Sequence, residues 1–214
     1  LMNPYYCGVV SSQAVVENLR KLIPNGYLVK NNHIYRFNRL CGGNRAAITI
    51  HGIGQRISHN LINDSPDCGI SLSDNNNILE FNEIHDVVAH SREIGAIYTW
   101  DGSRPLTFRG NILKNNFIHH VTDHYSPTNI DRPAAVHLDG VSSNVTLSGN
   151  VFYRTMEILT HAPDSRFENN IFVNRVSCAP AIAYTNWSHL LEKGDKLTPW
   201  GERCLWVLKI VDYK

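Results

Sequence analysis

Aromatic, histidine and carboxylate residues alternate with apolar residues in two short segments of this 214-residue chain. The segments read G-A-I-Y-T-W-D and A-V-H-L-D-G. Successive side chains of a strand point to opposite faces, so Tyr98 and Trp100 share one face of the first segment, as His137 and Asp139 do in the second. Aromatic rings stack on the apolar faces of sugars, while carboxylates and histidines exchange protons. Together they indicate acid–base chemistry on a sugar.

Three more candidates lie close to these segments. Asp101 follows Trp100, Glu93 precedes the first segment, and His161 takes the outward position on the next strand-like segment. The same alternation predicts that the intervening Ile97, Thr99, Val136 and Leu138 point inward. The candidate catalytic residues are Asp101, Asp139 and Glu93, and the candidate substrate-binding residues are Tyr98, Trp100, His137, His161 and Arg109.

A repeat elsewhere in the chain predicts how these segments are positioned. An apolar residue, a short polar gap, an Asn, a variable residue and a second apolar residue recur around Asn38, Asn60, Asn82, Asn116, Asn150 and Asn170. The first two steps are 22 residues each (60−38 and 82−60). Repeats of about 20 to 25 residues build solenoids, whose units stack on a shared core. We expect each Asn to occupy a left-handed turn and to hydrogen-bond to its neighbour in a ladder.

A second series of strand-like segments runs between the Asn-centred copies. It aligns on Ile48, Ile70, Ile97, Val136, Ile158 and Ile182. Leucine-rich repeats share the period, but their signature needs regularly spaced Leu, whereas these copies use Ile, Val and Phe. Several short strands per turn with no helical period between them predict a parallel β-helix.

The spacing of the two series predicts where loops emerge. In the early copies an Asn is followed by the next strand after 10 residues and a strand by the next Asn after 12 (48−38 and 60−48). The corresponding steps are 15 from Asn82 to Ile97, 19 from Ile97 to Asn116, and 20 from Asn116 to Val136. Insertions in a solenoid form loops that often carry function. These insertions flank the two chemistry-bearing segments.

Composition excludes several classes of function and partner. The formal net charge of +1 gives no electrostatic case for nucleic acid or an anionic membrane. Five Cys without a C-x-x-C motif indicate neither a zinc knuckle nor a dense disulfide framework. We expect no cofactor and no metal. The weakest option weighed is a metal at His85 and His119, predicted to stack on neighbouring rungs, with His120, Asp123 and His124 nearby in sequence.

The run from Gly95 to Asn111, G-A-I-Y-T-W-D-G-S-R-P-L-T-F-R-G-N, resembles a motif of right-handed parallel β-helix proteins related to glycoside hydrolase family 141. The runs I-S-H-N-L-I, F-N-E-I-H-D, V-H-L-D and S-G-N-V-F-Y-R are also similar. The resemblance implies a pectate-lyase-like fold, cleavage of glycosidic bonds in complex glycans, and acidic site positions at Asp101, Asp139 and Glu93. One departure is that the family's Arg-Asp is Trp100-Asp101 here.

The predicted fold class is therefore all-β: a single-stranded right-handed parallel β-helix with short terminal capping segments. We expect residues 1–30 to be a partly helical cap or the remnant of an upstream region, 31–186 the repeats, and 187–214 a C-terminal cap. The expected partner is a polysaccharide or oligosaccharide, with no nucleic acid or membrane, and the protein is expected to be a secreted, extracellular monomer.

Three functions fit this sequence. The first is glycoside hydrolysis by the pair Asp101 and Asp139, one carboxylate protonating the leaving oxygen and the other acting as nucleophile or activating water. The second is a polysaccharide lyase, which needs a Lys, Arg or Tyr base and a Ca²⁺ or Arg such as Arg104, Arg109 or Arg132. The third is a non-catalytic glycan-binding or structural module.

Overall fold

The computed structural model describes residues 9–11, 23–40, 45–91, 93–99, 109–121, 133–139, 144–162, 164–175 and 182–184. Within this part of the chain every regular element is a strand of three to five residues. No helix in it is long and apolar enough to cross a membrane. The expected helical segment within residues 1–30 and the expected C-terminal cap at 187–214 lie outside the described residues, apart from the strands at 9–11 and 28–30.

The strands form three sheets, and every pairing between neighbours is parallel. The first sheet holds β1 (Val9–Ser11), β4 (Ile48–Ile50), β7 (Ile70–Leu72), β10 (Gly95–Thr99), β13 (Ala134–Leu138), β16 (Ile158–Thr160) and β19 (Ile182–Tyr184). The second holds β2 (Leu28–Lys30), β5 (Arg56–Ser58), β8 (Ile78–Glu80), β11 (Ile112–Lys114), β14 (Thr146–Ser148) and β17 (Arg166–Glu168). The third holds β3 (His33–Tyr35), β6 (Leu61–Asn63), β9 (Glu83–His85), β12 (Phe117–Val121), β15 (Val151–Thr155) and β18 (Ile171–Val173).

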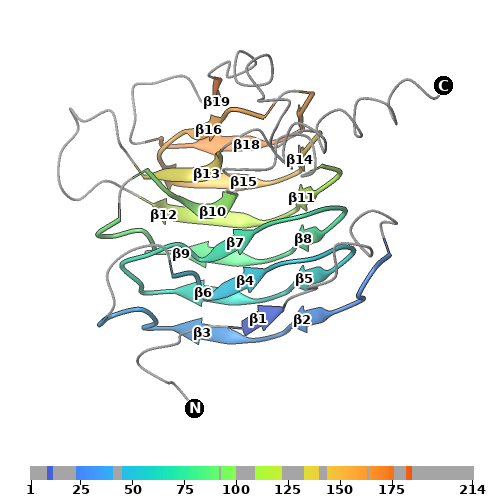
Figure 1. Cartoon of the computed structure of the whole chain (residues 1–214). Helices are drawn as coiled ribbons and strands as arrows, with labels where there is room; N and C mark the ends of the chain where they lie inside the picture. Colours follow the sequence, from blue (N-terminus) through green and yellow to red (C-terminus); the bar gives the residue numbers. More distant parts are fainter. Residues whose placement is uncertain are drawn as a thin grey trace, which may run out of the picture.

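The chain visits the three sheets in turn and then starts the next layer, as Figure 1 shows from the blue strands to the orange ones. Three all-parallel sheets traversed in this order fit a parallel β-helix solenoid. Pairing reaches back to β1 and β2, before residue 31, because β1 pairs with β4 and β2 with β5.

The predicted alignment of the first sheet is confirmed. Ile48 pairs with Ile70, Ile70 with Ile97, Ile97 with Val136, Val136 with Ile158, and Ile158 with Ile182. All but Ile182 are buried, as are Thr99 and Leu138, so the predicted inward face is correct. One column of β-branched and aliphatic side chains therefore fixes the register of the sheet, because a slip by one residue would expose the whole column.

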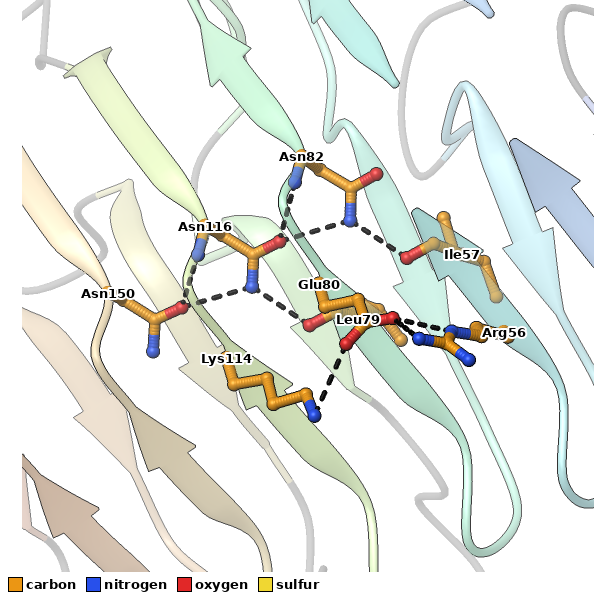
Figure 2. A network of polar contacts seen from close by, with 8 residues as sticks. All are labelled: Arg56, Ile57, Leu79, Glu80, Asn82, Lys114, Asn116 and Asn150. Carbon is orange, nitrogen blue, oxygen red and sulfur yellow. Dashed lines mark hydrogen bonds and ion pairs between the residues drawn. The ribbon is translucent and has the colours of Figure 1, made fainter. Parts of the chain in front are cut away.

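A ladder of Asn side chains runs through the turns between the second and third sheets. In Figure 2 the backbone N–H and side-chain amide of Asn82 both donate to Oδ1 of Asn116 at 3.0 Å. Asn116 repeats this toward Asn150, and its amide also donates to the carbonyl of Leu79 at 2.9 Å. The same bonds continue to Asn60 below and Asn170 above. Each side chain thus satisfies buried backbone and side-chain groups of the neighbouring rungs.

The first member of the ladder among the described residues is Asn32. The prediction that Asn38 holds this first position was wrong. Asn32 donates to Oδ1 of Asn60, and His33 pairs with Leu61. Asn38 lies beyond the third sheet, where its buried amide donates to Asp67 at 2.8 Å. The apolar neighbours of Asn38 mimic the repeat, but the true step is 28 residues (60−32).

This correction also changes the map of insertions. From Asn32 to Ile48 there are 16 residues (48−32), against 10 from Asn60 to Ile70 (70−60). The first rung therefore carries an insertion as well, and the interruptions are not confined to the middle rungs. Their position alone is a weaker guide to function than the sequence suggested.

The repeated Asn were also expected to hold the left-handed backbone conformation; Asn38, outside the ladder, does so with φ 52°, but the ladder Asn do not. The residue just before each ladder Asn does so instead. These residues have φ between 53° and 65°: Asn31, His59, Phe81, Asn115, Gly149 and Asn169. A left-handed residue turns the chain sharply between two strands. The following Asn is then free to aim its amide along the solenoid axis.

Glu80 crosses the second sheet between two cations (Figure 2). Its side chain is 1% exposed, and it accepts from Arg56 on β5 and from Lys114 on β11, the latter at 3.2 Å. Burial alone would raise the pKa of Glu80, but the hydrogen bonds and charges of Arg56 and Lys114 outweigh it and hold the pKa below 4.5. This carboxylate joins three successive rungs.

Replacing Asn116 by Ala will destabilise the fold by about 3 kcal/mol or more, because the N–H groups of Asn82 and the carbonyl of Leu79 lose their buried partner. Denaturant unfolding followed by circular dichroism measures the change. The matched control is Asn32→Ala at the exposed end of the ladder, where the side chain only donates; the expected loss is below about 1 kcal/mol. Equal losses at the two positions would contradict a cooperative ladder.

Replacing Glu80 by Gln will lower the unfolding free energy at pH 7 by about 1–2 kcal/mol, since a half-exposed Arg56 limits the loss. Because the folded pKa is depressed, the Glu80 contribution is present above pH 4.5 and disappears as the pH falls through the folded value. Stability of Glu80→Gln, measured from pH 7 to 3, should thus fall less steeply than that of the parent. Glu168→Gln, in the same column but exposed, should follow the parent within about 0.5 kcal/mol.

Candidate functional site

Polar side chains from three neighbouring strands gather on the outer face of the first sheet. Tyr98 on β10 pairs in register with His137 on β13, and their ring centroids are 5.4 Å apart. The ring of His161, just after β16, lies 5.7 Å from that of His137. The backbone N–H of His161 donates to Leu138, which places it level with Asp139. The parallel register therefore brings together residues up to 63 positions apart (161−98).

The Asp139 carboxylate lies at the centre of this group. Its Oδ2 accepts a hydrogen bond from the Tyr98 hydroxyl at 2.9 Å. Its Oδ1 is 3.9 Å from Nε2 of His137 and 3.9 Å from Nε2 of His161. The two oxygens thus face different partners, a phenol on one side and two imidazoles on the other. We call Tyr98, His137, Asp139 and His161 the outer-face cluster.

His137 is buried although its strand position faces outward. Only 1% of the residue is exposed, since the rings of Tyr98 and His161 lie on either side of it. Gly95 allows the close approach of β10, because a Cβ there would lie 2.6 Å from the backbone nitrogen of His137. Neither ring nitrogen of His137 meets the geometry of a hydrogen bond, although the backbone of Glu93 lies close enough to act on its pKa. Strand alternation predicted an outward, solvated side chain and gave no signal of this burial.

Burial sets the protonation of His137 and Tyr98, which both face Asp139. It lowers the pKa of His137 to about 4; the charge of His161 acts in the same direction, while Asp139 and the Glu93 backbone oppose it. Burial also raises the pKa of the Tyr98 hydroxyl well above its ordinary value, and the negative charge of Asp139 and its hydrogen bond add to the effect. At neutral pH His137 is a neutral base and Tyr98 a protonated donor.

The remaining predicted site residues are placed less closely together. Glu93 is exposed just before β10, and its charge contributes to the raised pKa of Tyr98. Arg109 lies at the corner before β11, where its backbone N–H donates to the side chain of Asn75 at 2.7 Å. Among the described contacts none joins the Arg109 side chain to the outer-face cluster. Trp100 and Asp101 lie outside the described residues.

A second polar group lies on the third sheet. His85 and His119 stack at 4.5 Å with an interplanar angle of 9°, which confirms the predicted stacking. His85 Nδ1 is 2.6 Å from Asp86, and His119 contacts Glu83 at 3.2 Å and His120 at 2.7 Å. These contacts occupy Nδ1 of His85 and both ring nitrogens of His119, and Glu83 is exposed.

A shallow, open pocket of about 450 Å³ lies at the corner between the third and first sheets. It is lined by Arg39, Asp64, Ser65, Pro66, Asp86, Ala89 and His90. Asp64 is paired there with Arg36 and Arg39. The pocket does not include any member of the outer-face cluster, and its lining offers ion pairs rather than a convergent acid–base set.

Comparison of this chain with models of protein families, with curated proteins and with solved structures found no match.

The protonation of His137 can be measured directly. In a histidine ring titration by NMR we expect its pKa near 4, and a still lower value in Asp139→Asn, because the Asp139 charge raises it. Between about pH 6.5 and 4 the unfolded chain binds a proton that folded His137 does not, so stability falls as the pH is lowered through this window. A His137 midpoint at or above 6.5 would contradict the buried, neutral ring.

Proposed function

We propose that the outer face of the first sheet, above β10, β13 and β16, binds a polysaccharide or oligosaccharide and hydrolyses its glycosidic bonds with two carboxylates. The observation that carries the proposal is the Asp139 carboxylate, hydrogen-bonded by Tyr98 and faced by His137 and His161 on an outer surface. A carboxylate held between donors and bases on an open sheet can exchange protons with a bound sugar.

Asp101 is the proposed second carboxylate. Thr99 pairs with Leu138, Asp139 follows Leu138 by one residue, and Asp101 follows Thr99 by two. Neighbouring parallel strands are about 4.8 Å apart, so continued pairing of these two strands would bring the two carboxylates within the range of a glycosidase pair. Carboxylates about 5 Å apart retain the anomeric configuration, and those about 6.5–9.5 Å apart invert it. The anomer of the first product therefore reports the distance between the two groups.

Hydrolysis is favoured over elimination by the state of Tyr98. A lyase needs a base that removes a proton next to a sugar carboxylate, and an ionised Tyr is one such base. Burial and the Asp139 charge raise the pKa of Tyr98, so it remains a donor at neutral pH. Such a phenol suits the orientation of a carboxylate rather than proton abstraction. Arg104 and Arg132, the other lyase candidates besides Arg109, lie outside the described residues.

The proposal also covers the handedness of the β-helix and its resemblance to a family. About 98% of the crossover connections between parallel strands of one sheet are right-handed, which supports a right-handed helix. The run from Gly95 to Asn111 resembles glycoside hydrolase family 141 and carries the idea of a complex glycan substrate. We propose a secreted monomer that acts outside the cell on such a glycan.

The test is a release assay on a panel of plant and host glycans that follows new reducing ends and the ultraviolet absorbance of unsaturated sugars. Reducing ends without absorbance are expected, and Asp139→Asn and Asp101→Asn should each lower the rate by about 100-fold or more. The matched control is Asp64→Asn, the same change at an exposed ion pair on a distant corner, which should leave the rate within about twofold.

Two other outcomes would overturn the proposal. Absorbance that rises together with the reducing ends means elimination. If neither reducing ends nor absorbance increase while glycan binding is retained on an affinity gel, the surface binds glycans without catalysis. The folded state of each variant is checked by circular dichroism before the assay.

A further inference from the structure

Three members of the outer-face cluster can direct one ligand atom each toward a common point. His137, Asp139 and His161 offer nitrogen and oxygen atoms that all lie within 4.8 Å of one another. Asp139 Oδ1 is equidistant, at 3.9 Å, from Nε2 of the two histidines. Around a tetrahedral ion with bonds of about 2.0–2.1 Å, ligand atoms are about 3.3 Å apart. Small side-chain rotations would close the difference.

The Asp139 carboxylate is already oriented for this role. Tyr98 donates to Oδ2, which turns Oδ1 toward the two imidazoles. Metal-binding carboxylates commonly have their second oxygen held by such an outer hydrogen bond, which fixes the ligand before the ion arrives. Tyr98 is therefore a positioning residue, because it reaches the site only through Asp139.

His137 supplies an independent reason to expect a ligand. Both of its ring nitrogens are buried, and neither meets the geometry of a hydrogen bond, although the Glu93 backbone lies near enough to the ring to raise its pKa. A buried polar group left unpaired destabilises the folded state, and such groups in folded proteins call for an explanation. An ion bound at Nε2 would pair one of the two nitrogens. No neighbouring side chain among the described residues does so.

The donor set selects the class of ion. Ca²⁺ and Mg²⁺ prefer shells of oxygen atoms, whereas two imidazoles and one carboxylate suit Zn²⁺ and its first-row neighbours. Three protein ligands leave at least one position for water or substrate, as in catalytic rather than structural zinc sites. We propose that His137, Asp139 and His161 form a binding site for a divalent transition metal of the zinc class, on the outer face of β13 and β16.

This proposal replaces the expectation, drawn from the sequence, that the protein has no metal. The residues weighed there, His85 and His119, also lie within reach of a third ligand, Glu83. Three of their four ring nitrogens, Nδ1 of His85 and both of His119, are engaged by Asp86, His120 and Glu83, and Glu83 is exposed. An ion there would have to displace existing contacts, whereas at His137 it would supply a missing one.

Metal binding goes beyond the proposed hydrolysis and is measured without any glycan. If a bound ion takes Oδ1 of Asp139, the water on that ion becomes the nearest acid–base group to the sugar. The two proposals therefore fail separately: a chain that binds metal and cleaves no glycan overturns hydrolysis alone, and a chain that cleaves glycans but binds no Zn²⁺ overturns the metal site alone.

The experiment titrates the 214-residue chain, freed of metal by a chelator, with Zn²⁺ in a calorimeter and with Co²⁺ in a visible spectrophotometer. One equivalent is expected to bind, with the visible bands of a low-coordinate Co²⁺ site. His137→Ala and His161→Ala should each weaken binding by at least about 100-fold, and Tyr98→Phe by about 10-fold, as outer-shell changes do. Thermal unfolding with and without Zn²⁺ gives a second readout.

The matched control is the double variant His85→Gln and His119→Gln, which removes the other imidazole pair and should bind Zn²⁺ as the parent does. Circular dichroism confirms that each variant is folded; if His137→Ala is not, His161→Gln carries the test, because its position at the end of β16 is less enclosed. No binding, or binding lost in the His85/His119 variant and kept in the His161 variant, would overturn the proposal.

Discussion

Vertical stacking of identical positions is the constraint on which the rest of this structure depends. Each Asn of the ladder accepts from the backbone and side chain of the rung before it and donates to the rung after it. A rung that slipped by one residue would break these bonds and turn its apolar column outward. A second ladder, from Gln55 through Asn77 to Asn111, fixes the corner where the second sheet begins. The register is therefore specified twice in each turn, by amides and by side-chain packing.

That register is what creates the site. The outer-face cluster draws on β10, β13 and the residue after β16, which are far apart in sequence but adjacent in the sheet. Because strands of a parallel sheet are stacked in fixed register, the spacing between Tyr98, Asp139 and His161 depends on the ladders and the core, not on the intervening loops. A loop of any length can leave the solenoid between these strands without moving the polar groups. This separation lets a rigid frame hold an acid–base group while the surrounding segments vary.

The chemistry of the cluster follows from partial burial. The cluster is largely removed from water, while Asp139 stays partly accessible. Burial therefore keeps His137 neutral and Tyr98 protonated. The two oxygens of Asp139 face different partners. The same arrangement suits proton transfer to a sugar and coordination of an ion, because both need a carboxylate held in one orientation beside imidazole groups. Metal occupancy would decide which of these roles Asp139 takes.

The amino-acid sequence by itself determined the class of the fold, and it singled out the four residues that the structure brings together in the outer-face cluster. Period-2 alternation and the recurring Asn predicted parallel strands, the alignment from Ile48 to Ile182 and the inward face, because these follow from local residue type and spacing. It misplaced the first ladder position at Asn38, since similar apolar neighbours occur twice and only the strand pairing of His33 with Leu61 distinguishes them. Only the tertiary structure decided that His137 is enclosed and unpaired and that Asp139 divides its oxygens between Tyr98 and the imidazoles. Those properties depend on the distance between side chains of different rungs, which no local pattern contains.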